Sequence, residues 1–433
     1  MAASPLAEGK RSTSAHLTVK VTNPSDVARR DVPVVIDLKK HLGKKAANIL
    51  FAEVIPLPSS TKVTSLPSLT GGVGGGSSSP PSLTGGAGGG SSLPSQLDDL
   101  DGDLVPDELS FVCDVAARST ASFRVEFSAV RPPRPYRPRT AAFMKVWDRK
   151  YRYPYINSIE YQGRNEPLAT YDAIYGHGAQ WESELVGFRV YMDHRQSIDI
   201  YGKPTPQLVL DRTNFYSTRE DIAAGRGCDI LFAGPSVGAG SFRGYVGGEP
   251  TYVDSVEARG QRVVASGPVR AIVEVWDKNW FYNSKTLQMR QRYTIYAGHR
   301  DVQVDITLAG AAVDDELFCT GVQKLEMDNE GYMALASGLV GSWGRNIPDK
   351  AAEDLVEGVG LGVYVGPAYL SSKKEDSYNY LTILCPRDGR IRYHLAICAL
   401  MERDGFRDSK GWFAWLEQWS TELNEPCTIN VKK

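Results

Sequence analysis

The sequence predicts an all-β protein with an N-terminal β-sandwich, a second and larger antiparallel sandwich, and few helices. Many short segments alternate apolar and polar residues with a period of two, which is the pattern of strands with one buried face. The 433 residues include 21 Tyr, 8 Trp, 42 Gly and 25 Pro, a mixture that favours strands joined by turns. Helical periodicity is rare along the chain.

We expect the first domain, a β-sandwich, over residues 14–130. Its strand-like segments are 16–21, 32–38, 108–114 and 122–129. Between them, residues 59–96 form a Gly/Ser/Pro-rich tract in which SLTGGVGGGSS is repeated as SLTGGAGGGSS. Such a tract buries too little apolar surface to offset the entropy lost on ordering, so we expect a disordered insertion within the domain.

The second domain is expected over residues 140–433, after a Pro/Arg run at 131–139 that we interpret as an extended linker. Its strand-like segments are 155–161, 185–192, 196–201, 262–265, 269–276, 288–296, 302–309 and 380–385. One clear helix is predicted at 411–424, where three tryptophans and two leucines share one face and are expected to pack on the sandwich.

Charge and hydropathy exclude two classes of function. The 49 Lys and Arg against 51 Asp and Glu leave a net charge of −2, which argues against a nucleic-acid-binding protein. No run of 18 or more apolar residues occurs, so we expect no membrane-spanning helix. Six cysteines are present without a CxxC pair, a pattern that favours buried thiols over a zinc ribbon.

The densest polar stretch runs from Tyr175 to Lys203, YGHGAQWESELVGFRVYMDHRQSIDIYGK. Its second half is predicted to be a hairpin with a turn at 193–195. By alternation, Arg189 and Tyr191 share one face of the first strand, and Asp199, Tyr201 and Lys203 share one face of the second. This band suits an anionic, hydroxyl-rich ligand, and the alternative is an exposed face of cross-strand pairs.

Among the six histidines, His177 is the strongest functional candidate. It lies between two glycines in a loop before a strand, where the backbone can approach a ligand and the ring stays accessible. His299, in a turn beside Arg300, is the second candidate.

One motif predicts a cation. Carboxylates at Asp99, Asp101 and Asp103, with a glycine at 102 for the turn and Asp107 after it, resemble a short calcium loop, although without the spacing of a twelve-residue EF-hand loop. We expect a structural calcium ion there at most, and no required cofactor.

Four motifs, in this order, resemble the bacterial family named domain of unknown function 4861. They are the stretch from 175 to 203, then GPVRAIVEV, YTIYAGHRDVQVDITL and ELFCTGVQK, and the preceding DLDGDLVPDELSF is similar to the close of that family's N-terminal sandwich. The resemblance extends over nearly the whole chain from about residue 14, except the insertion. It implies a β-supersandwich like those of polysaccharide lyases and galactose mutarotases, and export to the periplasm with the signal peptide removed.

The resemblance also implies a reaction. It is a carbon–oxygen lyase reaction at a uronic acid of a polysaccharide-derived oligosaccharide, such as one from ulvan. The enzyme eliminates water, as a dehydratase does, or a glycosyl group, and the product is a 4,5-unsaturated uronate. Removing the C5 proton builds charge on the carboxylate, so a cation and an acid–base pair are needed.

We expect His177 as base or acid, Tyr191 as its partner and Arg189 on the carboxylate, with the division of roles open. Further substrate contacts are expected from Lys203, Tyr201, Glu182, Glu184, Trp181, His299 and Arg300.

Two alternatives remain, and the oligomeric state is open. A glycoside hydrolase would need two carboxylates beside the scissile bond, from among Glu182, Glu184, Asp199 and Asp229. A non-catalytic carbohydrate-binding protein would stack sugars on Trp181, Trp280 and Tyr282. Convergence of His177, Tyr191 and Arg189 at one pocket would favour the lyase.

Overall fold

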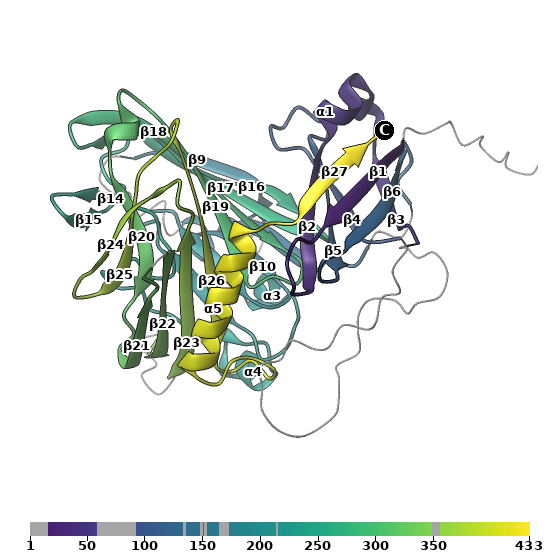
Figure 1. The fold of residues 1–433 in the computed structure, drawn as a ribbon. Coiled ribbons are helices and arrows are strands. Elements are labelled where there is room, and N and C mark those ends of the chain that lie inside the picture. Colours follow the sequence, from purple (N-terminus) through teal and green to yellow (C-terminus); the bar gives the residue numbers. More distant parts are fainter. Residues whose placement is uncertain are drawn as a thin grey trace, which may run out of the picture. The chain divides into compact units, whose positions relative to one another are not determined.

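The computed structural model describes residues 16–58, 92–132, 136–147, 150, 154–163, 173–213, 215–335, 337–348 and 356–433. These residues form antiparallel sheets with few helices, which confirms the predicted all-β fold class (Figure 1). Most of the expected insertion at 59–96 lies outside the described residues. Its end needs correction, because Ser95–Asp98 forms strand β4.

The chain divides into two compact units, and the first is interrupted by the second, because the C-terminal residues return to it. One unit contains the described residues up to Tyr136 together with Cys427–Lys433, and the other lies within Arg137–Pro426. The range expected for the second domain, 140–433, is therefore corrected at its C-terminal end.

The first unit is a sandwich of a four-stranded and a three-stranded sheet. The first sheet has the order β27-β1-β6-β3, with β27 (Thr428–Lys432), β1 (His16–Thr22), β6 (Thr120–Ser128) and β3 (Phe51–Pro56). The second has the order β2-β5-β4, with β2 (Arg29–Asp37) and β5 (Glu108–Val115). Helix α1 (Leu38–Leu42) and the 3₁₀ helix η1 (Gly43–Asn48) follow β2. Alternate residues of both sheets, among them Val19, Val34 and Phe111, fill the core.

The second unit contains three sheets. The six-stranded sheet has the order β13-β12-β11-β10-β7-β8, with β13 (Cys228–Asp229), β12 (Ile198–Gly202), β11 (Gly187–Tyr191), β10 (Gly178–Ser183), β7 (Thr140–Lys145) and β8 (Tyr155–Ile156). The five-stranded sheet has the order β15-β14-β20-β25-β24, with β15 (Glu249–Thr251), β14 (Arg243–Val246), β20 (Phe318–Gln323), β25 (Asn379–Leu384) and β24 (Leu370–Glu375).

The largest sheet has nine strands in the order β21-β22-β23-β26-β19-β18-β17-β16-β9. Their bounds are β21 (Met327–Met333), β22 (Gly338–Asn346), β23 (Glu357–Val365), β26 (Arg390–Ala399), β19 (Asp301–Ala309), β18 (Lys285–Tyr296), β17 (Arg270–Tyr282), β16 (Ala258–Ser266) and β9 (Ser158–Gln162). Its inner face shares one core with the two smaller sheets, in which Val273 and Tyr293 lie with Phe188 and Phe318. Short helices α3 (Leu210–Thr213), α4 (Arg219–Ala223) and η2 (Val313–Asp315) lie in the connections.

Helix α5 (Ser409–Asn424) covers part of the outer face of the nine-stranded sheet (Figure 1). The Asp408 side chain caps it by accepting from the Gly411 amide at 2.8 Å. Trp412, Leu416 and Trp419 are buried against β22, β23 and β26, and Trp415 is partly buried beside them, which confirms the predicted helix. None of the described helices is long and apolar enough to span a bilayer.

His394 on β26 is expected to make folding stability depend on pH. Burial lowers the pKa of His394 to about 4, opposed by Asp301 and Asp305 and assisted by Arg392 and His299. An unfolded histidine has a pKa of about 6.5, so this contribution is complete above that pH and is lost as the pH falls to about 4. The free energy of unfolding should fall by up to about 3 kcal/mol across that window.

Urea unfolding across the same pH range tests this prediction. In the variant His394→Gln the pH-dependent loss should be smaller, since the partly buried imidazole that would be protonated is no longer present. An equal loss in both proteins would assign the pH dependence to other groups.

Candidate functional site

A buried arginine stands at the centre of the candidate site. The predicted hairpin is confirmed: β11 and β12 pair antiparallel, with Arg189 directly opposite Asp199. Arg189 is 1% exposed, and its Nη2 donates to the Asp199 carboxylate and, at 3.0 Å, to the Tyr191 hydroxyl. Burial alone would lower the pKa of Arg189, but Asp199 and the nearby phenols raise it well above its usual range. The guanidinium therefore keeps its charge inside the protein.

Three aromatic rings surround this guanidinium. Its Cζ lies 4.6 Å from the ring centroid of Phe215, 4.8 Å from that of Tyr191 and 5.2 Å from that of Tyr216. At such distances the electron-rich ring faces attract the cation. Its Nε and Nη1 atoms have no hydrogen-bond partner within the described part of the chain, so the rings provide the main contacts on that side.

His177 is presented by a strained turn at the start of β10. Its φ is +61°, its amide donates to the Ile174 carbonyl at 2.9 Å, and its carbonyl accepts from the Met192 amide at 2.8 Å. The next residue, Gly178, has to be glycine, because a Cβ there would lie 1.8 Å from the Val190 carbonyl oxygen. A side chain held in the left-handed region by surrounding contacts is a common feature of functional sites.

The ring of His177 contacts two tyrosines of the site. Its ring is stacked on Tyr191, with centroids 5.9 Å apart, and meets Tyr216 edge-on at 6.0 Å. A groove of about 520 Å³ opens here, lined by Trp147, Ile174, Tyr175, Gly176, His177 and Tyr216. His177 therefore lines the groove and contacts Tyr191, which in turn accepts a hydrogen bond from Arg189. The expected convergence is thus met as a contact chain, while Tyr191 and Arg189 are not among the residues that line the groove.

Tyr216, Phe215 and Trp147 belong to this site but were not predicted from the sequence. They lie in connections between elements, where no periodicity marks a residue. Burial raises the pKa of Tyr216, against the opposing effect of Arg189, so its phenol remains a hydrogen-bond donor near neutral pH.

A second carboxyl group, Asp229, lies behind Arg189. Its Oδ2 is 4.0 Å from the same Nη2 that binds Asp199. Burial and then the negative charge of Asp199 raise the pKa of Asp229 well above its usual range, while Arg189 opposes the shift. Asp199 and Asp229 thus share one guanidinium, and Asp229 holds its proton more tightly than an ordinary carboxyl.

The structure corrects the expectation that Lys203 and Glu182 bind substrate. Their side chains are 0% and 1% exposed and form an ion pair. Lys203 also donates to the carbonyls of Ser183 and Gln207, and Glu182 accepts from the amides of Val209 and Leu210. Burial lowers the pKa of Lys203 and Glu182 opposes that shift. All of their bonds are internal, which makes this pair structural.

The expected aromatic contacts are also corrected. Tyr201, Trp181 and Trp280 are 0% exposed and Tyr282 is 4% exposed, so none can stack on a sugar. The Tyr201 hydroxyl donates to the Gly227 carbonyl at 2.9 Å. Period-two alternation placed these residues on a face of a strand but could not show that another sheet covers it.

The remaining predicted substrate contacts have partners elsewhere. Glu184 forms an ion pair with Arg139 at 2.6 Å and accepts from the Gly298 amide. His299 Nδ1 is 2.8 Å from Asp301 Oδ1, and Arg300 Nη1 is 2.9 Å from Glu402. None of the three predicted residues lines the groove at His177.

The predicted calcium residues lie together around a lysine. Carboxylate oxygens of Asp99, Asp101 and Asp107 lie within 4.8 Å of one another, and Asp103 is outside that group. Lys39 Nζ lies 2.7 Å from Asp107, 3.1 Å from Asp101 and 3.6 Å from Asp103. A calcium ion would compete with this ammonium group for the same oxygens.

We expect Lys39→Met to bind calcium about tenfold more tightly than the unchanged protein, because the variant removes a competing charge. Calcium titration calorimetry measures this difference. The control is Lys40→Met, which removes the same charge from the neighbouring residue of α1. Equal affinities in the two variants would contradict competition at the carboxylates.

Glu182→Gln should lower the free energy of unfolding by about 3 kcal/mol, because it leaves the Lys203 ammonium buried without its counter-ion. Urea unfolding measures the loss, and adding Lys203→Met should restore part of it. Unchanged stability in Glu182→Gln would show that the pair is not structural.

Several solved structures are similar to this chain, among them two proteins from Enterococcus faecalis. One is a protein in glycosyl hydrolase family 38 from Enterococcus faecalis, at 9% identity and a TM-score of 0.47 over 98% of this chain and 48% of that one. The other is an alpha-mannosidase from Enterococcus faecalis V583, at 10% identity and a TM-score of 0.45 over 96% of this chain and 46% of that one. This chain spans about half the length of each. No curated protein matches the sequence.

A comparison with known protein families gives a match over most of the chain. Residues 76–429, well over half of the chain, match the family described as domain of unknown function (DUF4861). This confirms the resemblance carried by the motifs between 175 and 323, and the chain belongs to the DUF4861 family.

Proposed function

We propose that the protein is a carbohydrate-active lyase, which eliminates water or a glycosyl group at a uronic acid of an oligosaccharide to give a 4,5-unsaturated uronate. The observation that carries the proposal is the contact chain from His177, which lines the groove, to Tyr191, on which its ring is stacked, and on to Arg189, which donates to the Tyr191 hydroxyl. Elimination next to a carboxylate needs an acid, a base and a nearby positive charge, and this cluster contains a residue suited to each.

Tyr191 is the residue we assign as the base. Arg189 donates a hydrogen bond to its oxygen, and the Arg195 guanidinium lies 5.1 Å from its ring centroid. Both cations favour negative charge on the phenol oxygen, which is the form that removes the C5 proton.

His177 is then the acid that protonates the leaving oxygen at C4. Its ring lines the groove and is stacked on Tyr191, so a sugar bound in the groove contacts His177 and lies next to the ring of Tyr191. The protonated phenol of Tyr216 is a donor for the substrate carboxylate.

Arg189 has a different role from the one expected. Because it is 1% exposed and bound to Asp199, it cannot hold the substrate carboxylate directly. Its positive charge lies behind Tyr191 and Tyr216 and stabilises the negative charge that develops in the groove. The guanidinium also positions both rings. We therefore assign it as a positioning residue.

The glycoside hydrolase is the second candidate, favoured by the presence of Asp199 and Asp229 near the site. Two carboxyl groups whose environments differ are typical of such enzymes. However, Asp199 is 4% exposed, and none of the described residues that line the groove is acidic. This arrangement supports the lyase better.

The proposal includes a substrate class and a location. The substrate is a uronic-acid-containing oligosaccharide, and the resemblance to exported bacterial proteins supports the periplasm. The chemistry assigned to these side chains needs no cofactor.

Mass spectrometry of oligosaccharides with a non-reducing terminal uronic acid tests the reaction, together with ultraviolet absorbance of the new double bond. Loss of one water with new absorbance is expected. His177→Ala and Tyr191→Phe should each lower kcat about 100-fold or more, because each removes a proton-transfer group.

The matched controls are His41→Ala and Tyr378→Phe, which change the same residue types outside the groove and should leave kcat unchanged. Cleavage into smaller sugars without absorbance would support the hydrolase instead. No change across a panel of uronates would overturn the enzymatic proposal.

A further inference from the structure

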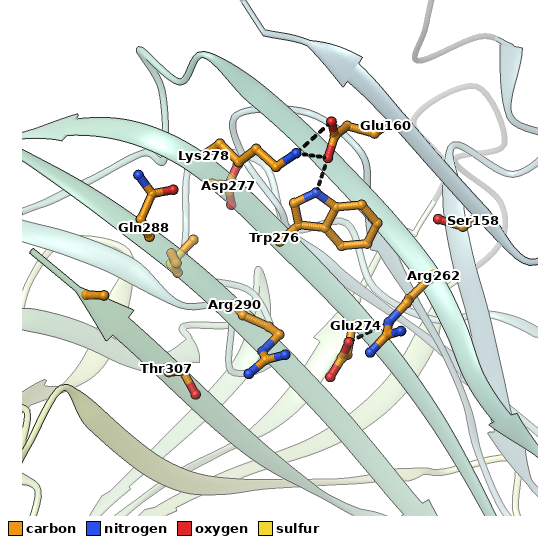
Figure 2. A pocket seen from close by; sticks show the side chains of 12 residues that line it. Ser158, Glu160, Arg262, Glu274, Trp276, Asp277, Lys278, Gln288, Arg290 and Thr307 are labelled. Carbon is orange, nitrogen blue, oxygen red and sulfur yellow. Dashed lines mark hydrogen bonds and ion pairs between the residues drawn. The ribbon is translucent and has the colours of Figure 1, made fainter. Parts of the chain in front are cut away.

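The outer face of the nine-stranded sheet holds a second groove. Helix α5 packs on this face at β22, β23 and β26 (Figure 1). The second groove lies on the part of the face that strands β19 to β9 form. The groove has a volume of about 610 Å³ and is lined from strands β9, β16, β17, β18 and β19 (Figure 2). It shares no residue with the groove at His177.

Two neighbouring cross-strand rows form this face, and the first is neutralised by its own ion pairs. The strand register aligns Ser158, Arg262, Glu274, Arg292, Asp305 and Arg392. Glu274 binds Arg262 at 2.7 Å and Arg292 at 2.6 Å, and Asp305 binds Arg392 at 2.5 Å. Opposite charges that face each other across strands stabilise a sheet, so this row has a structural explanation.

The second row contains a fixed aromatic ring. The register aligns Glu160, Gly260, Trp276, Arg290, Thr307 and Arg390. The indole of Trp276 lies against the backbone of Gly260, where a Cβ would be 2.1 Å from its Cζ2. Its Nε1 donates to Glu160 at 2.6 Å, and Lys278 binds the same carboxylate at 2.8 Å (Figure 2). The ring is therefore held in place before any ligand arrives.

The same row carries positive charge without counter-ions. Arg290 and Arg390 lie on either side of Thr307, and both are exposed. Neither side chain has an ion pair or hydrogen bond among the residues that the structure describes. With strands about 4.8 Å apart, the two arginine backbones are separated by about 10 Å. Next to a row that its own ion pairs neutralise, these two arginines remain available for an external anion.

We propose that this groove binds an anionic oligosaccharide through Trp276 and Arg290, which line it, and through Arg390, which follows Thr307 in the same row. A pyranose ring lies on the indole of Trp276, and the carboxylate or sulfate of the same or next sugar binds Arg290 and Arg390. A flat aromatic ring matches the apolar face of a sugar, and guanidinium groups match planar or tetrahedral oxyanions. This surface is a binding site separate from the proposed reaction and does not depend on it.

Native affinity electrophoresis of the full chain tests the proposal, with polygalacturonate, dextran sulfate or unmodified dextran in the gel. The His177→Ala variant is used so that the polymer is not altered during the run. Migration should be slowed by polygalacturonate, by dextran sulfate, or by both, and the pattern identifies which oxyanion is bound. Dextran should have no effect.

Two variants and one control separate this site from general charge attraction. Arg290→Gln and Trp276→Phe should each weaken the retardation, the former about tenfold in dissociation constant. Arg345→Gln, on strand β22, removes the same charge elsewhere and should behave like the parent protein. Equal effects of Arg290→Gln and Arg345→Gln, retardation by dextran, or no retardation by either anionic polymer would overturn the proposal.

Discussion

The buried pair of Arg189 and Asp199 is the interaction on which the candidate site depends. Taking a guanidinium out of water is costly, and a directly opposed carboxylate on the next strand offsets that cost. The buried guanidinium in turn contacts the aromatic side chains around it. Phe215, Tyr191 and Tyr216 face it, and the Tyr191 hydroxyl accepts its hydrogen bond. The site is thus an arrangement of aromatic rings around one internal charge, with His177 added at the solvent side.

The position of His177 depends on close packing between strands. Gly178 allows β10 to approach the backbone of β11, and the strained turn before it directs the histidine toward Tyr191. The adjacent Glu182–Lys203 pair anchors the start of α3 through the amides of Val209 and Leu210. Buried ion pairs therefore stabilise both the pairing of β11 with β12 and the start of α3.

In the nine-stranded sheet, the alternation of residues between the two faces forms both the core and the outer surface. On its inner face, alternate residues fill the hydrophobic core, and on the outer face the intervening residues form cross-strand rows. One row is self-neutralising, and the other combines a glycine-supported indole with arginines that lack counter-ions. A shift of one residue in register would exchange the two faces, so core formation and the second groove are specified together.

The sequence by itself determined the all-β class, part of the strands, the hairpin of β11 and β12, helix α5 and the shared face of Arg189 and Tyr191, because alternation and helical spacing are local properties. Strands such as β22, β23 and β26 were not predicted. Tertiary structure decided which faces are covered. It buried Trp181, Tyr201 and Lys203, brought Tyr216 to His177, placed Lys39 among the aspartates, and paired β27 with β1. These outcomes depend on contacts between residues far apart in the chain. A period of two shows that a strand has two faces, but only packing shows which of them meets solvent.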